Sequence, residues 1–288
     1  MQPDDTELFE EQRERLFGLA YRMLGTVAAA EDMVQDAYVR WHDVDSAAIE
    51  NPSAYLTTVV TRLCLDELKS ARKQRDAYTG PWLPAPIVAE RNATLPSVER
   101  DNALSMALLV VLEALSPVQR AVFVLREGFD IDYSTIARIV HRSPEHCRKI
   151  AQRARAHVGA RNRRYSTSRD EQEALVQAFV DAIEDGDPEQ LGTLLAEDAI
   201  SYSDGGGEVT AALRPIYGRE RITRFLLGLA RKARPDTRIE RVSVNGDPGF
   251  TIYVEKDVQS VWSFASNDNG QIDRLFTVLN PQKLSHVR

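Results

Sequence analysis

Hydrophobic residues recur at helical spacing through roughly the first 165 residues, and at strand spacing through most of the remainder. The first helical stretch ends in a basic run at about residue 78. The stretch that follows, residues 79–104, contains four prolines, and proline does not continue a helix. We therefore predict a helical domain over residues 1–78, a largely extended linker over 79–104 and a second helical domain over 105–165.

Residues 169–288 have a mixed pattern. One more helix is predicted over 170–184, and four stretches of alternating apolar and polar residues follow it. These stretches are 238–244, 250–255, 258–264 and 272–278, with Asn-Gly-Asp-Pro-Gly and Asn-Asp-Asn-Gly as turns between strands. The predicted fold class is multidomain, with two all-α domains and a C-terminal α+β domain that has an antiparallel sheet.

Composition limits the class of protein. The chain is 43% hydrophobic and 27% charged, as in soluble globular proteins, and no apolar run approaches the roughly 20 residues of a membrane span. The start of the chain is acidic and lacks a secretory signal, so we expect no membrane and a cytoplasmic location. Cys64 and Cys147 are isolated from any metal-binding cluster. We expect reduced, buried thiols, no metal and no cofactor.

Charge is distributed unevenly along the chain. The net charge is −7, which taken alone argues against a nucleic-acid binder. Residues 141–164 nevertheless hold eight Arg and Lys against one acidic residue, whereas residues 169–288 hold 14 basic and 20 acidic residues. The basic excess is therefore local, and a local excess on one element is the footprint that matters for DNA binding.

The first helical domain contains a helix with two unlike faces. Its apolar positions are Val34, Ala37, Tyr38 and Trp41, and its opposite, polar positions are Asp32, Gln35 and Asp36. Spacing alone leaves two interpretations open, a solvated surface and a partner-binding face.

A longer helix opens with Asn51 as N-cap and Pro52 as its first residue. Its polar face suits DNA, because long cations track phosphates while aromatic and hydroxyl groups contact unstacked bases. A solvated basic helix is the alternative. The predicted DNA-contacting residues are Asn51, Tyr55, Thr58, Thr61, Arg62, Lys69 and Arg72.

The stretch from Asp132 to Val158 has the pattern of a helix-turn-helix. Asp132 is predicted to cap the first helix, and Ser143 followed by Pro144 opens the second. The outward residues of the second helix suit the major groove. Glu145, Arg148, Lys149 and Gln152 are the predicted base contacts, and Arg153, Arg155, Arg161, Arg163 and Arg164 the predicted phosphate contacts. A plain helical hairpin is the alternative.

Together these motifs resemble the extracytoplasmic-function class of sigma-seventy-type factors, over about residues 8–160. Residues 9–78 resemble region two, and residues 107–160 resemble region four. The resemblance implies that Asp32, Gln35 and Asp36 contact core RNA polymerase, that the helix after Asn51 engages the minus-ten element, and that the last helix of region four reads the minus-thirty-five element. It also implies the β′ clamp, the β flap and promoter DNA as partners.

The C-terminal third resembles the SnoaL-like, ketosteroid-isomerase-like cone that one subgroup of these factors carries. The shared marks are a WLPEP-like linker, a DGGGK-like loop and an NPDKL-like end. Here Ala85 replaces Glu, Glu208 replaces Lys and Gln282 replaces Asp, which leaves the charge-pair role of those positions open. We expect regulatory contacts at Trp82, Pro84, Asp204, Gly205, Gly206, Gly207, Asn280, Pro281 and Leu284.

Three roles are open for this C-terminal domain. Catalysis would use a carboxylate such as Asp204 beside Tyr202, in a domain that also holds Tyr217, Tyr253, Trp262 and Phe276. However, the domain's one histidine, His286, lies at the end of the chain, and three consecutive glycines suit a closely approached loop better than a catalytic wall. A docking module is favoured over a pocket for a small-molecule ligand, and no catalytic residue is predicted.

The sequence thus predicts an alternative sigma factor, monomeric when free, that a fused domain regulates in cis. The other reading is a stand-alone helix-turn-helix regulator with a ligand-sensing or catalytic C-terminal domain. Residues 30–75 discriminate between the two, because a stand-alone regulator needs neither the acidic face nor a strand-opening helix.

Overall fold

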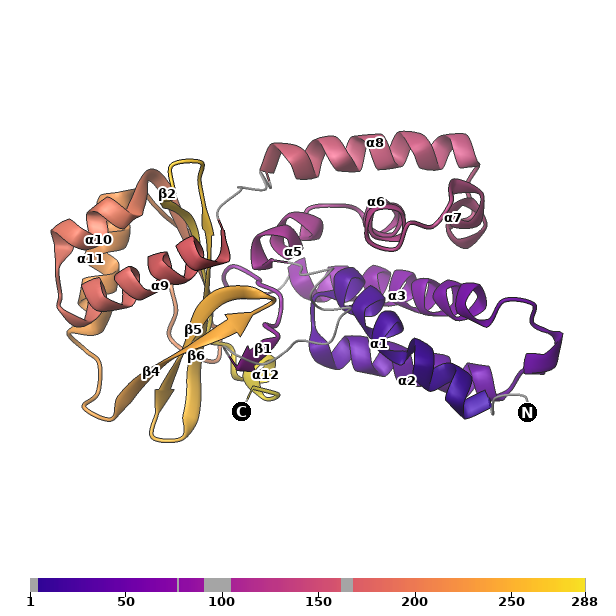
Figure 1. Ribbon diagram of the computed structural model, residues 1–288, viewed down its shortest axis with the longest axis horizontal. Coiled ribbons are helices and arrows are strands. Elements are labelled where there is room, and N and C mark those ends of the chain that lie inside the picture. The colour runs from indigo at the N-terminus through magenta and orange to yellow at the C-terminus, as the bar shows by residue number, and fades with distance from the viewer. Residues whose placement is uncertain (1–4, 77, 91–104, 162–167, 288) are drawn as a thin grey trace. The chain divides into compact units, whose positions relative to one another are not determined.

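The computed structural model describes residues 5–76, 78–90, 105–161 and 168–287 (Figure 1). The chain divides into two compact units. Unit 1 contains the helices that precede the linker and those of the helix-turn-helix segment. Unit 2 contains Tyr78, which is the last residue of the first predicted domain, the described linker residues 79–90, and the C-terminal domain.

Unit 1 is helical throughout its described residues. Its elements are α1 (Asp5–Leu24), α2 (Val27–His42), the short η1 (Ser46–Ala48), α3 (Pro52–Asp76), α6 (Pro117–Phe123), the π-helical η2 (Val124–Gly128), α7 (Tyr133–Val140) and α8 (Pro144–Arg161). Between the linker and α6 lies α5 (Met106–Glu113). The predicted apolar faces are buried: Val34, Ala37 and Trp41 of α2, and Cys147, Ile150 and Ala154 of α8, line the core.

The predicted helix starts are confirmed by their capping bonds. The Asn51 side chain accepts a bond from the Ala54 amide at 2.9 Å at the start of α3. The Asp132 carboxylate accepts from two amides at the start of α7. The Ser143 hydroxyl accepts from the His146 amide at 3.2 Å, directly before Pro144. Each cap satisfies an amide that lacks an intrahelical partner.

A buried arginine ties the early helices of unit 1 to the late ones. Arg120 of α6 is 2% exposed, and its Nε donates to the carbonyl of Arg22 in α1 at 2.8 Å. Its Nη1 also pairs with Glu113. The Arg22 guanidinium lies 4.9 Å from the centre of the Phe129 ring, and burial lowers the pKa of Arg22 to about 10. These cations hold α1 against α6 and η2 within the unit.

Unit 2 is an α+β domain built on one sheet. Its elements are β1 (Val88–Glu90), α9 (Arg169–Glu184), α10 (Pro188–Leu194), β2 (Leu195–Asp204), β3 (Ile216–Tyr217), α11 (Arg219–Ala230), β4 (Thr237–Val244), β5 (Asp247–Val254), β6 (Asp257–Ser266), β7 (Ile272–Val278) and α12 (Pro281–Leu284). The strand order is β1-β4-β5-β6-β7-β2-β3. The predicted helix and the four predicted strands correspond to α9, β4, β5, β6 and β7.

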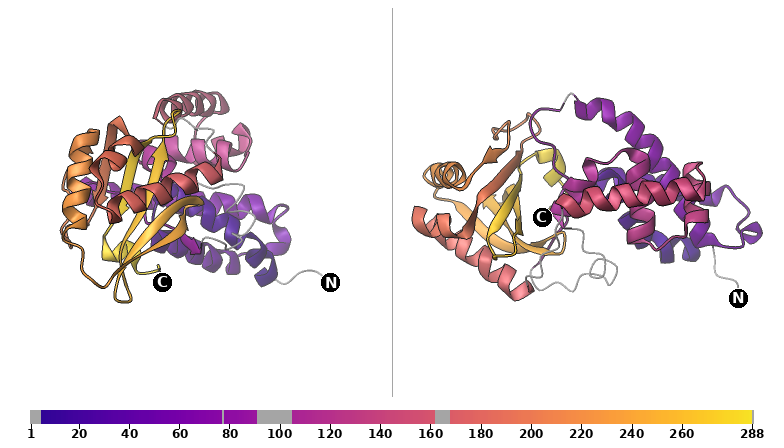
Figure 2. Two further views of the ribbon diagram at one scale, coloured as in Figure 1. Left: turned by 60° about the vertical axis from the view of Figure 1, so that its left-hand side comes forward. Right: turned by 90° about the horizontal axis from the view of Figure 1, so that it is seen from above.

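The sheet departs from the predicted antiparallel pattern at one place, because β2 runs parallel to β7. Strand β2 was not predicted, because exposed Glu197 and Asp198 break its alternation of apolar and polar residues, at an irregularity between Leu195 and Ile200. Helices α9, α10 and α11 cover one side of the sheet, and α12 lies on the other (Figure 2). Phe179 of α9 packs against Phe250 and Phe264 of the sheet.

The linker supplies a strand to this sheet. Val88, Ala89 and Glu90 pair antiparallel with β4, with Val88 opposite Val244. The Asn245 amide donates to the Ile87 carbonyl at 2.8 Å and extends the pairing. The chain reaches this edge from Leu83, which binds the end of β2. Because β4 and β2 are separated by three strands, the linker residues between Leu83 and Val88 must cross the sheet in an extended form, as their prolines predict.

We expect one acidic residue of unit 2 to destabilise it at neutral pH. Burial raises the pKa of Asp247 to about 6, and the charge of Arg169 opposes part of that rise. Because the folded-state pKa lies above the unfolded value, this carboxyl stabilises the fold fully below about pH 4, and that contribution is lost as the pH rises through 6. Asp247→Asn should therefore raise the free energy of unfolding by on the order of 1–3 kcal/mol near pH 7.5 and by little near pH 4. Denaturant titrations at both pH values check this, and an equal gain at both would contradict it.

Candidate functional site

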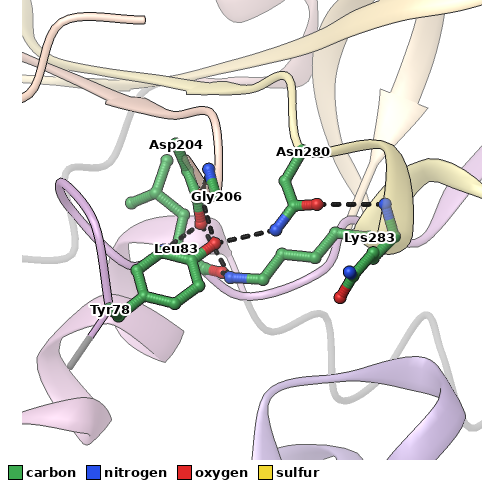
Figure 3. Close-up of polar contacts among 7 residues, drawn as sticks. Tyr78, Leu83, Asp204, Gly206, Asn280 and Lys283 are labelled. Carbon is green, nitrogen blue, oxygen red and sulfur yellow. Dashed lines mark hydrogen bonds and ion pairs between the residues drawn. The ribbon is translucent and has the colours of Figure 1, made fainter. Parts of the chain in front are cut away.

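A buried carboxylate at the end of β2 holds the linker (Figure 3). Asp204 is 0% exposed. Its Oδ1 accepts from the Tyr78 hydroxyl at 2.6 Å and from the Gly206 amide at 3.1 Å. Its Oδ2 accepts from the Leu83 amide at 2.7 Å and from Lys283 Nζ at 2.7 Å. We call these five residues, together with Asn280, the linker-binding site.

Lys283 neutralises the Asp204 carboxylate and also binds the linker. Its ammonium also donates to the Leu83 carbonyl at 2.6 Å. It lies 4.1 Å from the centre of the Trp82 ring and 4.9 Å from that of the Tyr78 ring. Lys283 and Asp204 are 7% and 0% exposed, so removing either one leaves an uncompensated buried charge. Such a loss costs about 3–5 kcal/mol.

Asn280 completes the site from the other side. Its Nδ2 donates to the Tyr78 oxygen at 2.8 Å, and its Oδ1 accepts from the Gln282 amide to cap α12. The Asp204 carbonyl accepts from the amides of Leu279 and Asn280. Burial and the bond to Asp204 raise the pKa of Tyr78 well above its ordinary value, so this phenol stays a donor at physiological pH.

The glycines that follow Asp204 leave no space for side chains. A Cβ at Gly206 would lie 2.7 Å from Asn280 Cγ, and its φ of +65° is one that other residues avoid. A Cβ at Gly205 would lie 2.7 Å from the Val209 carbonyl oxygen. Gly207 lies beside Thr79 of the linker. The predicted docking loop is therefore closed against the linker and the start of α12.

The remaining predicted regulatory residues lie around this site. Pro84 and Leu284 are buried, Trp82 is half-buried and Pro281 is exposed. Tyr78 and Lys283 were not predicted as site residues. Lys283 carried a signal, because it is a cation directly beside the apolar Leu284 in the Asn280–Leu284 motif. Tyr78 carried only its place directly before the proline-rich stretch.

The bonding of Asp204 bears on the catalytic alternative. Both of its oxygens are already shared among four donors, and a general base needs a carboxylate oxygen that can reach substrate. Tyr202, its neighbour, stacks on Phe276 with ring centres 5.7 Å apart. Within the described residues no group of His, Cys, Asp and Glu has the arrangement of a metal site.

The acidic face of α2 is exposed as predicted. Asp32, Gln35 and Asp36 are all open to solvent. Val39, one helical turn further on, is 52% exposed, and the sequence analysis did not single it out. An exposed apolar residue bordered by polar ones is typical of a partner-binding surface.

The exposed polar face of α3 contains fewer of the predicted residues than expected. Thr61 is 0% exposed and its hydroxyl donates to the Thr57 carbonyl at 2.7 Å, so it does not face solvent and the prediction that it contacts DNA is wrong in this conformation. A threonine can occupy a buried helix position by returning its hydroxyl to the preceding turn. Arg62 is exposed and donates to the Arg138 carbonyl of α7 at 3.2 Å.

The other predicted residues of α3 vary in surroundings. Lys69 is exposed and pairs with Asp66 at 2.7 Å. The Thr58 hydroxyl donates to the Ala54 carbonyl at 2.8 Å, and the Tyr55 ring lies 6.0 Å from that of Trp41. Asn51 is exposed and occupied as the helix cap. The Arg72 side chain lies outside the described residues.

The outer face of α8 is exposed throughout the predicted reading segment. Its exposed residues are Glu145, Arg148, Lys149, Gln152, Arg153 and Arg155. Arg148 lies 5.5 Å from the centre of the Tyr133 ring. Arg155 pairs with Glu127 at 2.7 Å and donates to the Tyr133 hydroxyl at 3.2 Å, so these contacts must exchange for it to bind phosphate. The Arg161 side chain and the whole of Arg163 and Arg164 lie outside the described residues.

Comparison with known proteins identifies the family to which the chain belongs. Residues 8–74 match the model "Sigma-70 region 2", residues 105–158 match "Sigma-70, region 4" and residues 176–267 match "SnoaL-like domain". The chain is 35% identical to the ECF RNA polymerase sigma factor SigJ of Mycobacterium tuberculosis, over 96% of this chain and 92% of the relative. The chain belongs to the ECF RNA polymerase sigma factors.

Further comparisons agree. The probable ECF RNA polymerase sigma factor SigI of M. tuberculosis is 29% identical, over 96% of this chain and 93% of its own length. The crystal structure of M. tuberculosis SigJ superposes with a TM-score of 0.79 at 33% identity, covering 97% of this chain and 98% of that one. No helix among the described residues is long and apolar enough to cross a membrane.

Two of the departures from the subgroup's motifs meet each other in the structure. Gln282 Nε2 donates to Glu208 Oε1, so the positions that carry Asp and Lys in the ECF motif carry a neutral donor and an acidic acceptor here. The third departure, Ala85, is buried at 2% exposure.

We predict that this pair is coupled. Gln282→Asp alone places two carboxylates together and should weaken the contact, whereas Gln282→Asp with Glu208→Lys should restore it as an ion pair. Because both side chains are exposed, the coupling free energy should be about 0.5–1 kcal/mol. A double-mutant cycle from denaturant titrations measures it, and additive effects of the two substitutions would contradict the coupling.

Proposed function

We propose that this ECF sigma factor binds core RNA polymerase, directs it to promoters, and is regulated in cis by its C-terminal domain through the docked linker. One observation carries the regulatory part. The linker is bound to the C-terminal domain by the buried Asp204 carboxylate rather than lying free between the two sigma regions. Its place of action is the cytoplasm, where polymerase and promoter DNA are.

We assign a separate role to each segment of the chain. Residues 1–78 act as region two, 79–104 as the linker, 105–165 as region four and 169–288 as the regulatory domain. The exposed α2 face contacts the polymerase β′ clamp, the polar face of α3 engages the minus-ten element, and α8 reads the minus-thirty-five element while region four meets the β flap. The exposure of α2 and α8 supports these assignments.

The linker is a physical route for regulation because of where it begins. Tyr78 follows α3 after a single residue, so its bond to Asp204 fixes the chain directly after the proposed minus-ten helix. Thirteen residues, 78–90, are held on the C-terminal domain, and when released they would add up to about 45 Å of reach. The two promoter elements lie about 25 base pairs apart, or roughly 85 Å at 3.4 Å per pair. Docking or release of the linker therefore changes which separations the two regions reach easily.

We propose no catalytic role for the C-terminal domain. The carboxylate that the catalytic alternative requires is committed to Tyr78, Leu83, Gly206 and Lys283. Its regulatory role does not require turnover.

Weakening the linker-binding site should change transcription. Tyr78→Phe removes the bonds to Asp204 and Asn280 but keeps the ring beside Lys283, so it should weaken docking by about 1–2 kcal/mol. That corresponds to about a 5–30-fold change in the ratio of docked to free linker. Run-off transcription with core polymerase from a cognate promoter measures the effect, with Tyr217→Phe as the matched control because Tyr217 is 56% exposed in the same domain. Equal output from both variants at equal core affinity would contradict cis regulation by this site.

The α2 face should be required for polymerase binding. Asp32→Lys with Asp36→Lys should lower the affinity for core polymerase by about tenfold or more, since each 1.4 kcal/mol is a factor of ten, and Val39→Ser should add to the loss. The control is Glu11→Lys with Glu14→Lys, which makes the same charge change at exposed positions of α1. Fluorescence titration with core polymerase measures the affinity of each variant. Equal losses of affinity in both double variants would contradict the assignment of the α2 face as the polymerase-binding surface.

A further inference from the structure

The outer face of α11 carries cations that no acidic group of the described chain neutralises. Arg221, Arg224, Arg231 and Lys232 are all exposed. Arg221 and Arg224 lie about one turn apart on α11, Arg231 is the C-cap of the helix, and Lys232 follows in the turn. The inner face of α11 packs Ile222 and Leu226 into the core, so this cationic face is turned outward. We call these four residues the α11 cationic face.

Elsewhere in the C-terminal domain, basic side chains are more often in ion pairs. Most of its other basic side chains are in ion pairs, namely Arg169 with Glu173, Arg234 with Asp236, Arg238 with Glu240, Arg274 with Asp273 and Lys283 with Asp204. None of the ion pairs found among the described residues involves the α11 cationic face. Glu220, its acidic neighbour in the first turn, is exposed and in no such pair with Arg224. In a domain of net negative charge, four exposed cations without an ion pair among the described residues therefore fall within residues 221–232.

A glycine in the middle of this face is a second and independent sign of a partner. Gly228 lies between the two pairs of cations, inside the helix. Glycine there costs about 1 kcal/mol relative to alanine. A Cβ at Gly228 would meet nothing within 4 Å, so no contact within the described chain calls for its absence. A smooth, cationic helix surface allows the close approach of an extended anion.

We propose that the α11 cationic face binds the phosphate backbone of duplex DNA upstream of the minus-thirty-five element. This inference rests on the proposed function, which places α8 in the major groove. Helix α8 ends at Arg161 and α9 begins at Arg169, so covalent geometry keeps the C-terminal domain within about 30 Å of the end of α8. From Arg221 to the C-cap residue Arg231 the helix rises about 15 Å, at 1.5 Å per residue, and this length suits several successive phosphates.

The chemistry of the face favours DNA over the other common polyanion, an anionic membrane. A membrane-binding helix presents several large apolar side chains beside its cations, whereas α11 has one exposed large apolar side chain, Leu229, which is 44% exposed. Arginine-rich surfaces that position a protein on DNA without reading its sequence need only phosphates.

The test is the salt dependence of DNA binding by the full chain. The probe is a labelled duplex with a minus-thirty-five element and about 20 base pairs upstream. Arg224→Gln with Arg231→Gln removes two of the cations. Arg241→Gln with Lys256→Gln is the control, since it makes the same charge change at exposed cations of the sheet. Each phosphate contact contributes about 0.9 to the slope of log affinity against log salt, so the first pair should lower the slope by about 1.8 and the control should leave it unchanged.

Four further measurements make the outcome decisive. Wild type on a duplex without the upstream extension loses the contacts of all four cations, so its slope should fall by up to about 3.6, twice the decrease expected for the double variant. Gly228→Ala should raise the thermal midpoint while weakening binding to the extended duplex. Equal slopes for the two double variants would overturn the inference, as would a selective loss of binding to anionic phospholipid vesicles with an unchanged DNA slope. If wild type itself does not distinguish the minus-thirty-five duplex from a scrambled one, then the proposed function fails instead.

Discussion

The organisation of the C-terminal unit depends on burying one carboxylate. Asp204 is fully removed from solvent, and an ionised carboxylate is tolerated there only with a counter-charge and enough donors. Those partners come from three parts of the chain that are far apart in sequence, Tyr78 with Leu83, Gly206, and Lys283. The domain therefore completes its own core only when the linker is in place. A linker that forms part of the core of a domain cannot be a passive tether.

This constraint connects the fold to transcription. The linker crosses from the end of β2 to the edge of the sheet, where it adds β1 beside β4. It thereby covers a sheet edge, which otherwise exposes unpaired backbone groups. The same residues separate region two from region four along the chain, so one equilibrium, docked against free, affects both the stability of the C-terminal domain and the reach of the DNA-binding regions. This is the route by which we propose that the fused domain regulates the sigma regions.

Much of this arrangement is predictable from the sequence, because it is encoded locally. Asn51, Asp132 and Ser143 cap helices where short-range rules place them, and the strands β4 to β7 follow the alternation of apolar and polar residues. What local rules do not encode is partnership across the fold. Tyr78 and Asp204 are separated by 126 positions, and nothing near either of them identifies the other. Thr61 fails for a related reason, because the helical pattern gives its face and tertiary packing decides its burial. The parallel pairing of β2 with β7 is likewise a property of the closed sheet rather than of either segment.

The central claim is that the linker is bound through Asp204 in the free protein and that this docking is what regulates the factor. Amide hydrogen exchange of residues 78–90 in the full chain tests it most directly. The account predicts slow exchange at Leu83, whose amide is buried on Asp204, and at Asn245, whose amide bonds to the linker, with both protections lost in Lys283→Met and altered when core polymerase and promoter DNA are bound. Exchange of the Leu83 amide at the rate of an unstructured peptide in the free wild-type protein, or protection that is the same in Lys283→Met as in wild type, would contradict it.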